Sequence, residues 1–277
     1  MSTDVVGRPV VPPEPFRRSR CGGTTILIWN VQRAREGRAR SQVDWMLKQS
    51  ADVIVLTEVP RGAVGDLLAR LLSGHGFQCA LPAPADGDAC RVLVAAHVAT
   101  VRQVALGPDS WRHRCAALRI GLAGDSGLGL VGMYVPSRGP TVRRNEAKRA
   151  FQDAVVQWLP DVRRILGSDA PVVIAGDLNV LERDHQPHYR VFGRWEYDFY
   201  ESFADCAFTD AIRMMNPGIS EHSWFGRSRA DGTRNGYRFD HAFVSDEHRP
   251  CVRSCNYDHL PRHMQLSDHS ALILTID

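Results

Sequence analysis

The sequence lacks the features of a membrane or disulfide-stabilised protein. No apolar run approaches the roughly 20 residues that a membrane-spanning helix needs. The first 23 residues contain prolines where a secretory signal peptide has a continuous apolar stretch. The seven cysteines are scattered, odd in number and form no C-x-x-C pair, which disfavours a disulfide framework or a zinc site. These absences predict a cytoplasmic protein with reduced thiols and no membrane partner.

Several common catalytic signatures are also missing. The chain has no G-x-S-x-G nucleophile elbow, no Walker phosphate loop and no H-E-x-x-H zinc motif. The stretch "GAVGDL" at 62–67 is no dinucleotide fingerprint and lies in an expected helix. Serine hydrolases of that type, P-loop enzymes and zinc peptidases are therefore disfavoured.

The composition is that of a globular protein with some basic clusters. Apolar residues make up 44% and charged residues 23%, which excludes a disordered chain. The net charge of +3 is too small to indicate an anionic partner by itself. Basic residues, however, gather at 33–40, 143–149 and 227–238. Such clusters are often solvated faces, and they also suit contact with a polyanion.

Short apolar runs of strand length recur along the chain. They are rich in β-branched residues and bounded by Gly, Pro, Asp or Asn, which favours strands over helices. These runs lie at 24–29, 52–57, 90–96, 115–122, 128–135, 171–176, 238–244 and 269–276. Helical spacing of apolar residues occurs at 41–50 and 145–166.

The order of these elements predicts an α/β fold. Strands that are apolar on both faces need cover on both sides, from helices or from another sheet. No linker interrupts the chain after residue 23. We therefore expect a flexible, mildly basic tail over 1–23 and a single domain over 24–277.

Several expected strands end in polar residues that the apolar pattern does not require. The set comprises Asn30, Glu58, Tyr134, Asp177, Asn179, Asp240, Asp268 and His269. Taken singly, each has an ordinary structural explanation, such as a turn former, a helix cap or a core tyrosine. Polar groups at the ends of several strands can nevertheless converge on one edge of a sheet, where open α/β folds bind ligands.

Together these residues contain the groups that metal-assisted cleavage of a phosphate ester requires. Glu58 offers a carboxylate to a hard cation such as Mg²⁺, and Asp177 is the natural base for a water nucleophile. A protonated His269, oriented by Asp240, could stabilise the charge that develops on phosphorus. Neutral donors for the same charge are Asn30, Asn179 and Tyr134. We interpret His241 as structural.

Six motifs in order resemble those of the endonuclease/exonuclease/phosphatase superfamily over residues 24–276: "WN", "TE", "YVPSRGP", "GDLN", "RFDH" and "SDH". The C-terminal third is most similar to exonuclease III-like, abasic-site nucleases, through "FADCAFTDAIRMMNPG" and "SWFGRSRADGTRNGYRFDHAFVS". The resemblance implies a four-layer α/β/β/α sandwich of two mixed sheets flanked by helices, as in deoxyribonuclease I. It also implies a Mg²⁺-dependent hydrolase, with Mn²⁺ as a possible substitute.

The resemblance assigns roles to individual residues. Asp177 would activate water, and His269, held by Asp240, would stabilise the transition state. The implied metal contacts are Glu58, Asp268 and Asn30. The implied phosphate-placing residues are Asn30, Asn179 and Tyr134. The implied pocket for a flipped-out abasic sugar is formed by Trp224, Tyr237 and Phe239. From the basic clusters, we expect DNA contacts at Arg143, Arg144, Lys148 and Arg234.

The leading prediction is a Mg²⁺-dependent phosphodiesterase acting on DNA, as an exonuclease or an abasic-site endonuclease. Thr57 and Gln32 depart from the repair nucleases, as does the stretch 181–200. The alternative is a phosphatase or phosphodiesterase for a small or lipid phosphate, which uses the same core and a narrower rim. An inactive scaffold would have lost some of the acids and amides, and none is missing. We expect a monomer without a stable protein partner.

Overall fold

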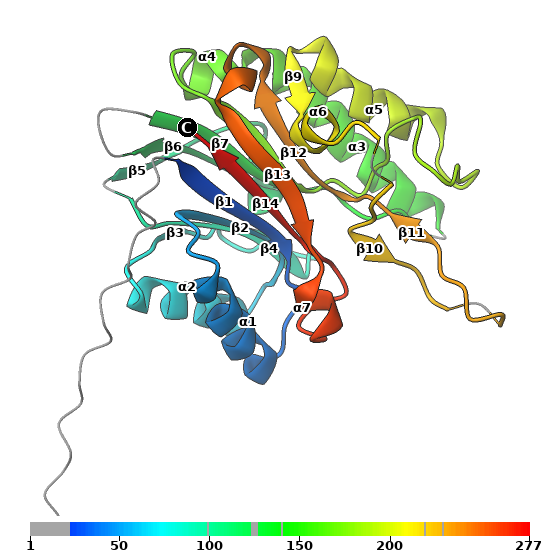
Figure 1. Ribbon diagram of the computed structural model, residues 1–277, viewed down its shortest axis with the longest axis horizontal. Helices are drawn as coiled ribbons and strands as arrows, with labels where there is room; N and C mark the ends of the chain where they lie inside the picture. Colours follow the sequence, from blue (N-terminus) through cyan, green and yellow to red (C-terminus); the bar gives the residue numbers. More distant parts are fainter. Residues whose placement is uncertain (1–22, 99, 123–126, 140, 219, 229) are drawn as a thin grey trace, which may run out of the picture.

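The computed structural model describes residues 23–98, 100–122, 127–139, 141–218, 220–228 and 230–277. The predicted N-terminal tail, apart from Gly23, lies outside the described residues, as does Arg229 of the third basic cluster. The described chain forms two six-stranded sheets, face to face, with helices on their outer sides (Figure 1). The predicted four-layer α/β sandwich is confirmed.

The first sheet has the order β13-β14-β1-β2-β4-β3. Its strands are β1 (Thr24–Asn30), β2 (Val53–Pro60), β3 (Gln78–Ala80), β4 (Cys90–Ala96), β13 (Val252–Asp258) and β14 (Ala271–Ile276). β1 and β2 are parallel, and the other pairs are antiparallel. The helices α1 (Glu36–Lys48) and α2 (Ala63–Gly74) cover its outer face.

The second sheet has the order β5-β6-β7-β8-β12-β9. Its strands are β5 (Thr100–Val104), β6 (Cys115–Gly121), β7 (Gly127–Tyr134), β8 (Val172–Asp177), β9 (Phe208–Asp210) and β12 (Asp240–Ser245). β7 and β8 are parallel. Its outer face carries α3 (Val142–Trp158), α4 (Val162–Leu166) and α5 (Arg194–Asp205). Shorter elements are α6 (Ala211–Met215), α7 (Leu260–His263) and the hairpin of β10 (Trp224–Phe225) and β11 (Gly236–Tyr237).

Apolar side chains fill all three interfaces between the four layers. Between the sheets, Ile28 and Val55 of the first sheet share a cluster with Leu130 and Val173 of the second. Separate clusters pack each sheet against its own helices. Because the strands are covered on both faces, they are apolar throughout, which is why the sequence revealed them.

The strands that sequence patterns missed are short or lie at sheet edges. β5 is an edge strand of the second sheet, and its residues are mostly exposed. β13 is an edge strand of the first sheet, and its residues alternate between buried and more exposed positions. Their polar residues face water and hide the strand pattern. None of the helices in the described part of the chain has both the length and the apolar composition of a membrane span.

Candidate active site

Most of the predicted site residues meet at the ends of interior strands, on the same side of the two sheets. β1 ends at Asn30, β2 carries Glu58 near its end, and β7 ends at Tyr134. Asp177 ends β8, where its register partners are Tyr134 on β7 and Asp240 at the start of β12. The fold therefore brings together strand ends that are far apart in the sequence.

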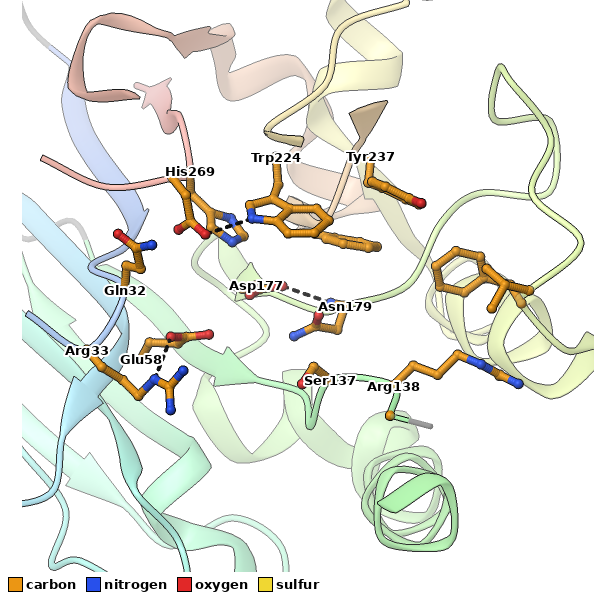
Figure 2. A pocket seen from close by; sticks show the side chains of 15 residues that line it. Gln32, Arg33, Glu58, Ser137, Arg138, Asp177, Asn179, Trp224, Tyr237 and His269 are labelled. Atoms are coloured by element: carbon orange, nitrogen blue, oxygen red, sulfur yellow. Dashed lines mark hydrogen bonds and ion pairs between the residues drawn. The ribbon is translucent and has the colours of Figure 1, made fainter. Parts of the chain in front are cut away.

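A cavity of about 540 Å³ opens at these strand ends (Figure 2). Its lining comprises Gln32, Arg33, Glu58, Ser137, Arg138, Gly139, Asp177, Asn179, Val191, Phe192, Trp224, Tyr237, Phe239, Asp268 and His269. Carboxylates and amides gather on one side, and aromatic rings form another wall. The cavity thus combines an acidic floor with an apolar wall.

Asp177 is held rigidly at the floor of the cavity. The preceding Gly176 has φ +147°, and a Cβ there would lie 2.0 Å from a backbone oxygen of β7, so only glycine fits. The Asn30 amide donates to Asp177 Oδ2 at 2.8 Å, and the Asn179 backbone N–H donates to Oδ1 at 3.0 Å. Burial and the carboxylate of Asp240 raise the pKa of Asp177 above its usual range. A fixed carboxylate of raised pKa is suited to accept a proton.

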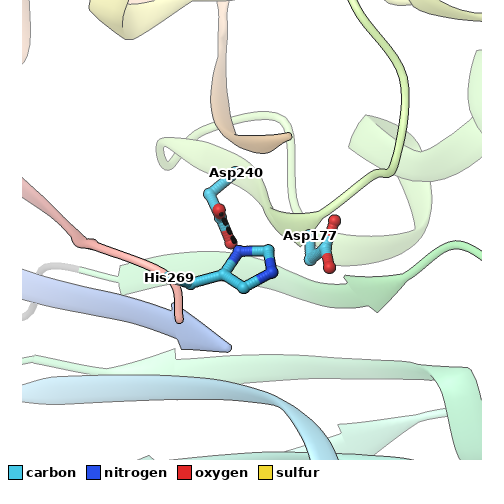
Figure 3. Close-up of side chains that lie close together, drawn as sticks. All are labelled: Asp177, Asp240 and His269. Atoms are coloured by element: carbon cyan, nitrogen blue, oxygen red, sulfur yellow. Dashed lines mark hydrogen bonds and ion pairs between the residues drawn. The ribbon is translucent and has the colours of Figure 1, made fainter. Parts of the chain in front are cut away.

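His269 lies between two carboxylates (Figure 3). Its Nδ1 donates to Asp240 Oδ2 at 2.7 Å. Burial alone would lower the pKa of His269, but Asp240, with help from Asp177, raises it to about 10. The imidazole is therefore protonated at neutral pH, and Nε2 remains a second donor.

The backbone of His269 is anchored to β1. The indole N–H of Trp29 donates to the His269 carbonyl at 3.1 Å. The Ser267 hydroxyl accepts from the His269 N–H at 3.1 Å and donates to the Asn30 carbonyl at 2.6 Å. The "SDH" motif is thus fixed in place by its own serine immediately before the final strand.

Glu58 stands at a β-bulge of β2. The pairing of β2 with β4 shifts register between Leu56 and Val59, and Glu58 has φ +52°. Bulges re-aim side chains, and this one turns the carboxylate into the cavity. Its Oε1 accepts from the Tyr134 hydroxyl at 2.9 Å, and its Oε2 lies 3.5 Å from Arg33 Nε. Burial raises the pKa of Tyr134, so its hydroxyl stays a neutral donor.

The oxygen donors of the cavity fit a hard divalent cation. Glu58 is 19% exposed at the cavity wall, and Asp268 has a buried Oδ1 that lacks a hydrogen-bond partner among the described residues. The other oxygen, Asp268 Oδ2, accepts from the Trp224 indole at 2.9 Å. Asn30 Oδ1 accepts from the Gln32 N–H at 2.8 Å, which leaves one lone pair. Carboxylate and amide oxygens of this kind are the ligands that Mg²⁺ prefers.

A second group could also hold a metal ion. One ligand atom each of Asp177, Asp240 and His269 lies within 4.8 Å of the other two. The protonated His269, however, already supplies a positive charge between the two carboxylates. Part of the negative charge of this group is therefore already neutralised without a metal ion.

Three aromatic rings form a continuous wall of the cavity. Tyr237 and Phe239 are stacked with centroids 5.1 Å apart, and Trp224 stacks on Phe239 at 5.7 Å. All three side chains are half-buried and line the cavity. They are therefore available to a ligand and do not belong wholly to the core.

Lys148 is buried, contrary to the prediction made from the sequence. We expected it on a DNA-facing helix surface, but its side chain is fully buried. Its Nζ donates to the Asn179 carbonyl at 2.7 Å and to Glu196 Oε1 at 2.5 Å. The prediction of a DNA contact at Lys148 is wrong, because the charge is enclosed and neutralised by Glu196. Lys148 instead fixes the backbone of Asn179.

The predicted arginine contacts remain at the surface. Arg143 and Arg144 are exposed on the first turn of α3, and Arg144 Nε donates to the Ser137 carbonyl at the cavity rim at 3.2 Å. Arg234 is exposed on the β10–β11 connection, where its Nε donates to the Gly226 carbonyl at 2.7 Å. None of these three side chains lines the cavity, and Arg144 contacts one residue of its lining, Ser137.

The structure adds site residues that sequence reasoning did not identify. Arg138 lines the cavity and pairs with the buried Glu196, which also accepts from the Gly193 N–H at 2.9 Å next to Phe192. Arg33 lines the cavity beside Glu58. Arg138 could have been found inside the motif "YVPSRGP". No sequence pattern indicated a role for Glu196, because a single glutamate in a helix is usually an exposed surface residue.

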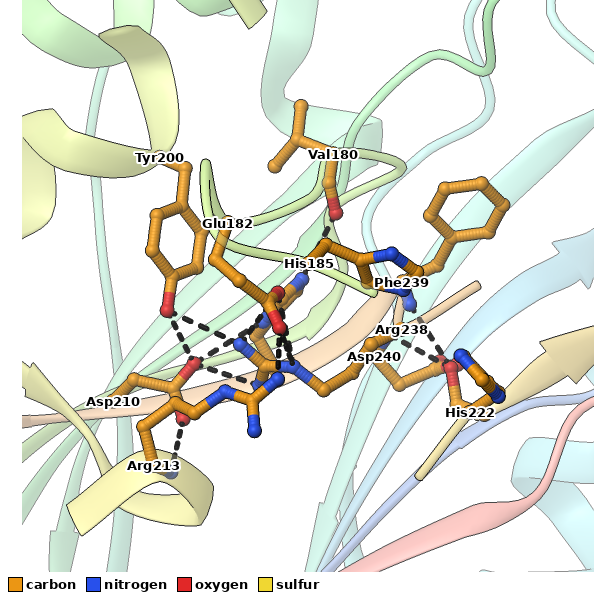
Figure 4. Close-up of polar contacts among 12 residues, drawn as sticks. Val180, Glu182, His185, Tyr200, Asp210, Arg213, His222, Arg238, Phe239 and Asp240 are labelled. Atoms are coloured by element: carbon orange, nitrogen blue, oxygen red, sulfur yellow. Dashed lines mark hydrogen bonds and ion pairs between the residues drawn. The ribbon is translucent and has the colours of Figure 1, made fainter. Parts of the chain in front are cut away.

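A second buried network of charges lies behind the site (Figure 4). Arg238 Nη2 donates to Glu182 Oε2 and Arg238 Nη1 donates to Asp210 Oδ2, both at 2.8 Å. Burial alone would raise the pKa of Glu182, but Arg238 lowers it to about 2. His241 is fully buried and donates from Nε2 to the Val180 carbonyl at 3.0 Å, in agreement with a structural role.

The fold and this site define a phosphoester hydrolase built on a four-layer α/β sandwich. Residues 27–269 match the model of the Endonuclease/Exonuclease/phosphatase family. The chain belongs to this family, and the resemblance drawn from its six motifs is confirmed.

Solved structures share the fold at low sequence identity. The AP endonuclease of Archaeoglobus fulgidus is 17% identical, with a TM-score of 0.74 over 92% of this chain and 99% of that one. The 3′-5′ exonuclease of Neisseria meningitidis is 19% identical, with a TM-score of 0.72 over 92% of this chain and 100% of that one. A 3′ phosphatase from Neisseria, bound to a product DNA hairpin, is 18% identical, with a TM-score of 0.74 over 92% and 99%.

Proposed function

We propose that this protein is a Mg²⁺-dependent phosphodiesterase that acts on DNA, as an abasic-site endonuclease or a 3′ exonuclease of the exonuclease III type. The observation that carries the proposal is a single cavity that joins an acidic floor to an aromatic wall. The similar structures are named as an AP endonuclease, an exonuclease and a DNA-bound phosphatase, which supports DNA as the substrate.

Asp177 is the proposed general base. Its two oxygens are oriented by the Asn30 amide and the Asn179 backbone, so the carboxylate meets a water molecule in one geometry. His269 is the proposed stabiliser of the transition state. Its Nδ1 is held by Asp240, so Nε2 can donate to a phosphate oxygen as negative charge develops there. Tyr134 and the Asn179 side chain complete the phosphate site.

Glu58, Asp268 and Asn30 are the proposed residues for Mg²⁺, with Mn²⁺ as a substitute. When bound, such a cation supplies Lewis-acid stabilisation to the phosphate oxygens. Tyr134 fixes one Glu58 oxygen and Trp224 fixes one Asp268 oxygen, so both carboxylates are preorganised.

The aromatic wall is the proposed recognition surface. Trp224, Tyr237 and Phe239 can stack on a base or pack against an abasic sugar, since base–aromatic stacking contributes roughly 1–3 kcal/mol per base. Arg143, Arg144 and Arg234 are exposed and can contact phosphates.

We also propose that residues 24–277 act as one catalytic domain in a monomeric, cytoplasmic enzyme. The cysteines of the described residues are free thiols, which suits a reducing compartment. Size-exclusion chromatography with light scattering checks the monomer.

One assay tests the proposed function. The purified protein is incubated with end-labelled abasic duplex, intact duplex and single-stranded DNA, with RNA, and with a small phosphatase reporter, in Mg²⁺, Mn²⁺ or EDTA. We expect cleavage of a DNA substrate in Mg²⁺ and Mn²⁺, and none in EDTA. Turnover of the small reporter without DNA cleavage would replace this proposal by the small-substrate alternative.

A further inference from the structure

Arg33 occupies an unusual place beside the proposed metal ligand. Figure 2 shows the side chains of Arg33 and Glu58 directed toward each other. Arg33 Nε lies 3.5 Å from Glu58 Oε2, and the Arg33 backbone N–H donates to the Glu58 carbonyl at 3.1 Å. Both the main chain and the side chain of Arg33 are therefore directed at Glu58.

The backbone here is held in a conformation that L-residues rarely adopt. Gln32 has φ +51°, Arg33 has φ +43° and the neighbouring Glu58 has φ +52°. Arg38 holds this turn, because its Nη1 donates to Gln32 Oε1 at 2.9 Å. Non-glycine residues at positive φ each carry strain and concentrate at functional sites. The strain places an arginine where a glycine would suit the backbone better.

The Arg33 side chain is largely exposed although its backbone is hydrogen-bonded to Glu58. It is 66% exposed, whereas the Glu58 side chain is 19% exposed. An ion pair that reaches into solvent is weak, so a guanidinium of this kind exchanges partners readily. A divalent cation at Glu58 would replace the charge that Arg33 supplies and would repel the guanidinium.

We infer that Arg33 is an exchangeable counter-ion and a phosphate-binding residue. It neutralises Glu58 while no cation is bound, and it moves to a phosphate of the substrate once a divalent cation takes its place. This inference rests on the proposed function for the identity of the substrate, but the competition between Arg33 and the cation does not. Guanidinium groups bind phosphate oxygens strongly, and Arg33 already lines the cavity.

The first measurement uses Mn²⁺ alone, titrated by calorimetry into the full chain and into Arg33→Ala. We expect Arg33→Ala to bind Mn²⁺ about two- to fivefold more tightly, the range for loss of one solvent-exposed ion pair. Unchanged or weaker Mn²⁺ binding would overturn the inference. Arg33→Gly removes the same charge, and glycine adopts positive φ without strain. Its Mn²⁺ affinity should therefore equal that of Arg33→Ala, and its stability should be at least that of Arg33→Ala.

The second measurement tests the phosphate contact. In an Asp177→Asn background, in which we expect cleavage to be slow, binding of duplex DNA is measured in Mg²⁺ at several salt concentrations. We expect Arg33→Ala to weaken binding about tenfold and to reduce the salt slope by about one. Arg33→Lys should restore the slope. Tighter Mn²⁺ binding with unchanged DNA affinity would show a counter-ion only and would overturn the exchange.

Two controls separate this inference from the proposed function. Arg35→Ala removes an exposed arginine that does not line the cavity, and it should leave Mn²⁺ affinity unchanged. Inorganic phosphate with Mg²⁺ replaces DNA in a parallel titration. If the native protein fails to bind or cleave DNA, the proposed function fails, whereas a weaker response of Arg33→Ala to inorganic phosphate would still support the exchange. An equal response of both proteins to phosphate would overturn it.

Discussion

Two buried clusters of charges lie next to each other near the start of β12, and the pKa values of their carboxylates shift in opposite directions. The cluster that we propose to be catalytic, called the catalytic cluster below, is Asp177, Asp240 and His269, and the arginine cluster is Glu182, Asp210 and Arg238. Arg238 and Asp240 are only two residues apart at the start of β12. In the catalytic cluster the pKa of Asp177 is raised, and in the arginine cluster the pKa values of both carboxylates are lowered.

The difference lies in the cation that each cluster contains. A guanidinium is charged at every accessible pH, so Arg238 stabilises its two carboxylates as anions and holds them in a fixed geometry. The catalytic cluster has an imidazole instead, and Asp240 Oδ1 lacks a hydrogen-bond partner among the described residues. The arginine cluster therefore holds its side chains in one charged arrangement. The catalytic cluster, whose carboxylates and imidazole titrate, can accept and donate protons.

The largest effect is expected from the catalytic cluster. Asp177→Asn should lower the rate of DNA cleavage in Mg²⁺ by about 10²–10⁴-fold, since it removes the base without changing the shape of the side chain. The melting temperature should stay equal or rise, because a buried carboxylate of raised pKa is removed. Single-turnover cleavage and thermal unfolding measure both.

The control for Asp177→Asn is Asp153→Asn, on the exposed face of α3. It should leave the rate unchanged. Retention of more than a tenth of the native rate by Asp177→Asn would remove Asp177 from the role of base.

Breaking the arginine cluster should affect stability more than chemistry. Arg238→Met keeps the volume but removes the buried guanidinium that pairs with both carboxylates, and only Glu182 keeps another guanidinium partner, Arg213. We expect a loss of about 3–5 kcal/mol in the free energy of unfolding. Chemical denaturation measures it. Arg183→Met, at an exposed ion pair with Glu201, should melt close to the native protein. An equal free energy of unfolding for Arg238→Met and the native protein would show that the arginine cluster does not stabilise the fold.

The arginine cluster should also determine part of the acid sensitivity. Glu182 has a pKa of about 2 in the folded protein against 4.5 ordinarily. A lowered folded pKa stabilises the protein above pH 4.5, and this stabilisation, roughly 3 kcal/mol, is lost as the pH falls from 4.5 through 2. Glu182→Gln should therefore show a flatter dependence of unfolding free energy on pH in that window. Parallel curves for the two proteins would contradict the assignment.

The smallest effect is expected from one hydrogen bond beside the catalytic cluster. Trp224→Phe keeps an aromatic ring but removes the indole N–H that donates to Asp268 Oδ2. The Mg²⁺ concentration for half-maximal activity should rise about tenfold, the lower range for loss of a residue that orients a metal ligand, with little change in kcat. Trp111→Phe, at an edge contact with Phe151 remote from the cavity, is the matched control. An unchanged Mg²⁺ requirement would show that the indole does not orient Asp268.

Sequence patterns predicted the layered fold because of how its strands are buried. Both faces of β1, β2, β7 and β8 pack against apolar side chains, so these strands are continuous apolar runs. Their polar final residues stood out against that background. The edge strand β13 stayed hidden, because one of its faces meets water and its sequence alternates.

Helix α3 shows where pattern reasoning failed. Helical spacing of apolar residues over 145–166 would bury Ala147, but Ala147 is exposed and the adjacent Lys148 is buried. A buried lysine is tolerated here because Glu196 neutralises it from α5, 48 residues further along the chain. No local pattern contains that partner.

The class of fold and the types of side chain at the site could be predicted from the sequence, because apolar runs must be buried and polar groups at the ends of neighbouring strands lie close together. Which charges face the cavity and which are enclosed depends on contacts between distant parts of the chain. Asn30 reaches Asp177 across 147 residues, and Arg238 reaches Glu182 across 56. The role of a charged side chain depends on its partners and on its access to water, and both are properties of the folded chain.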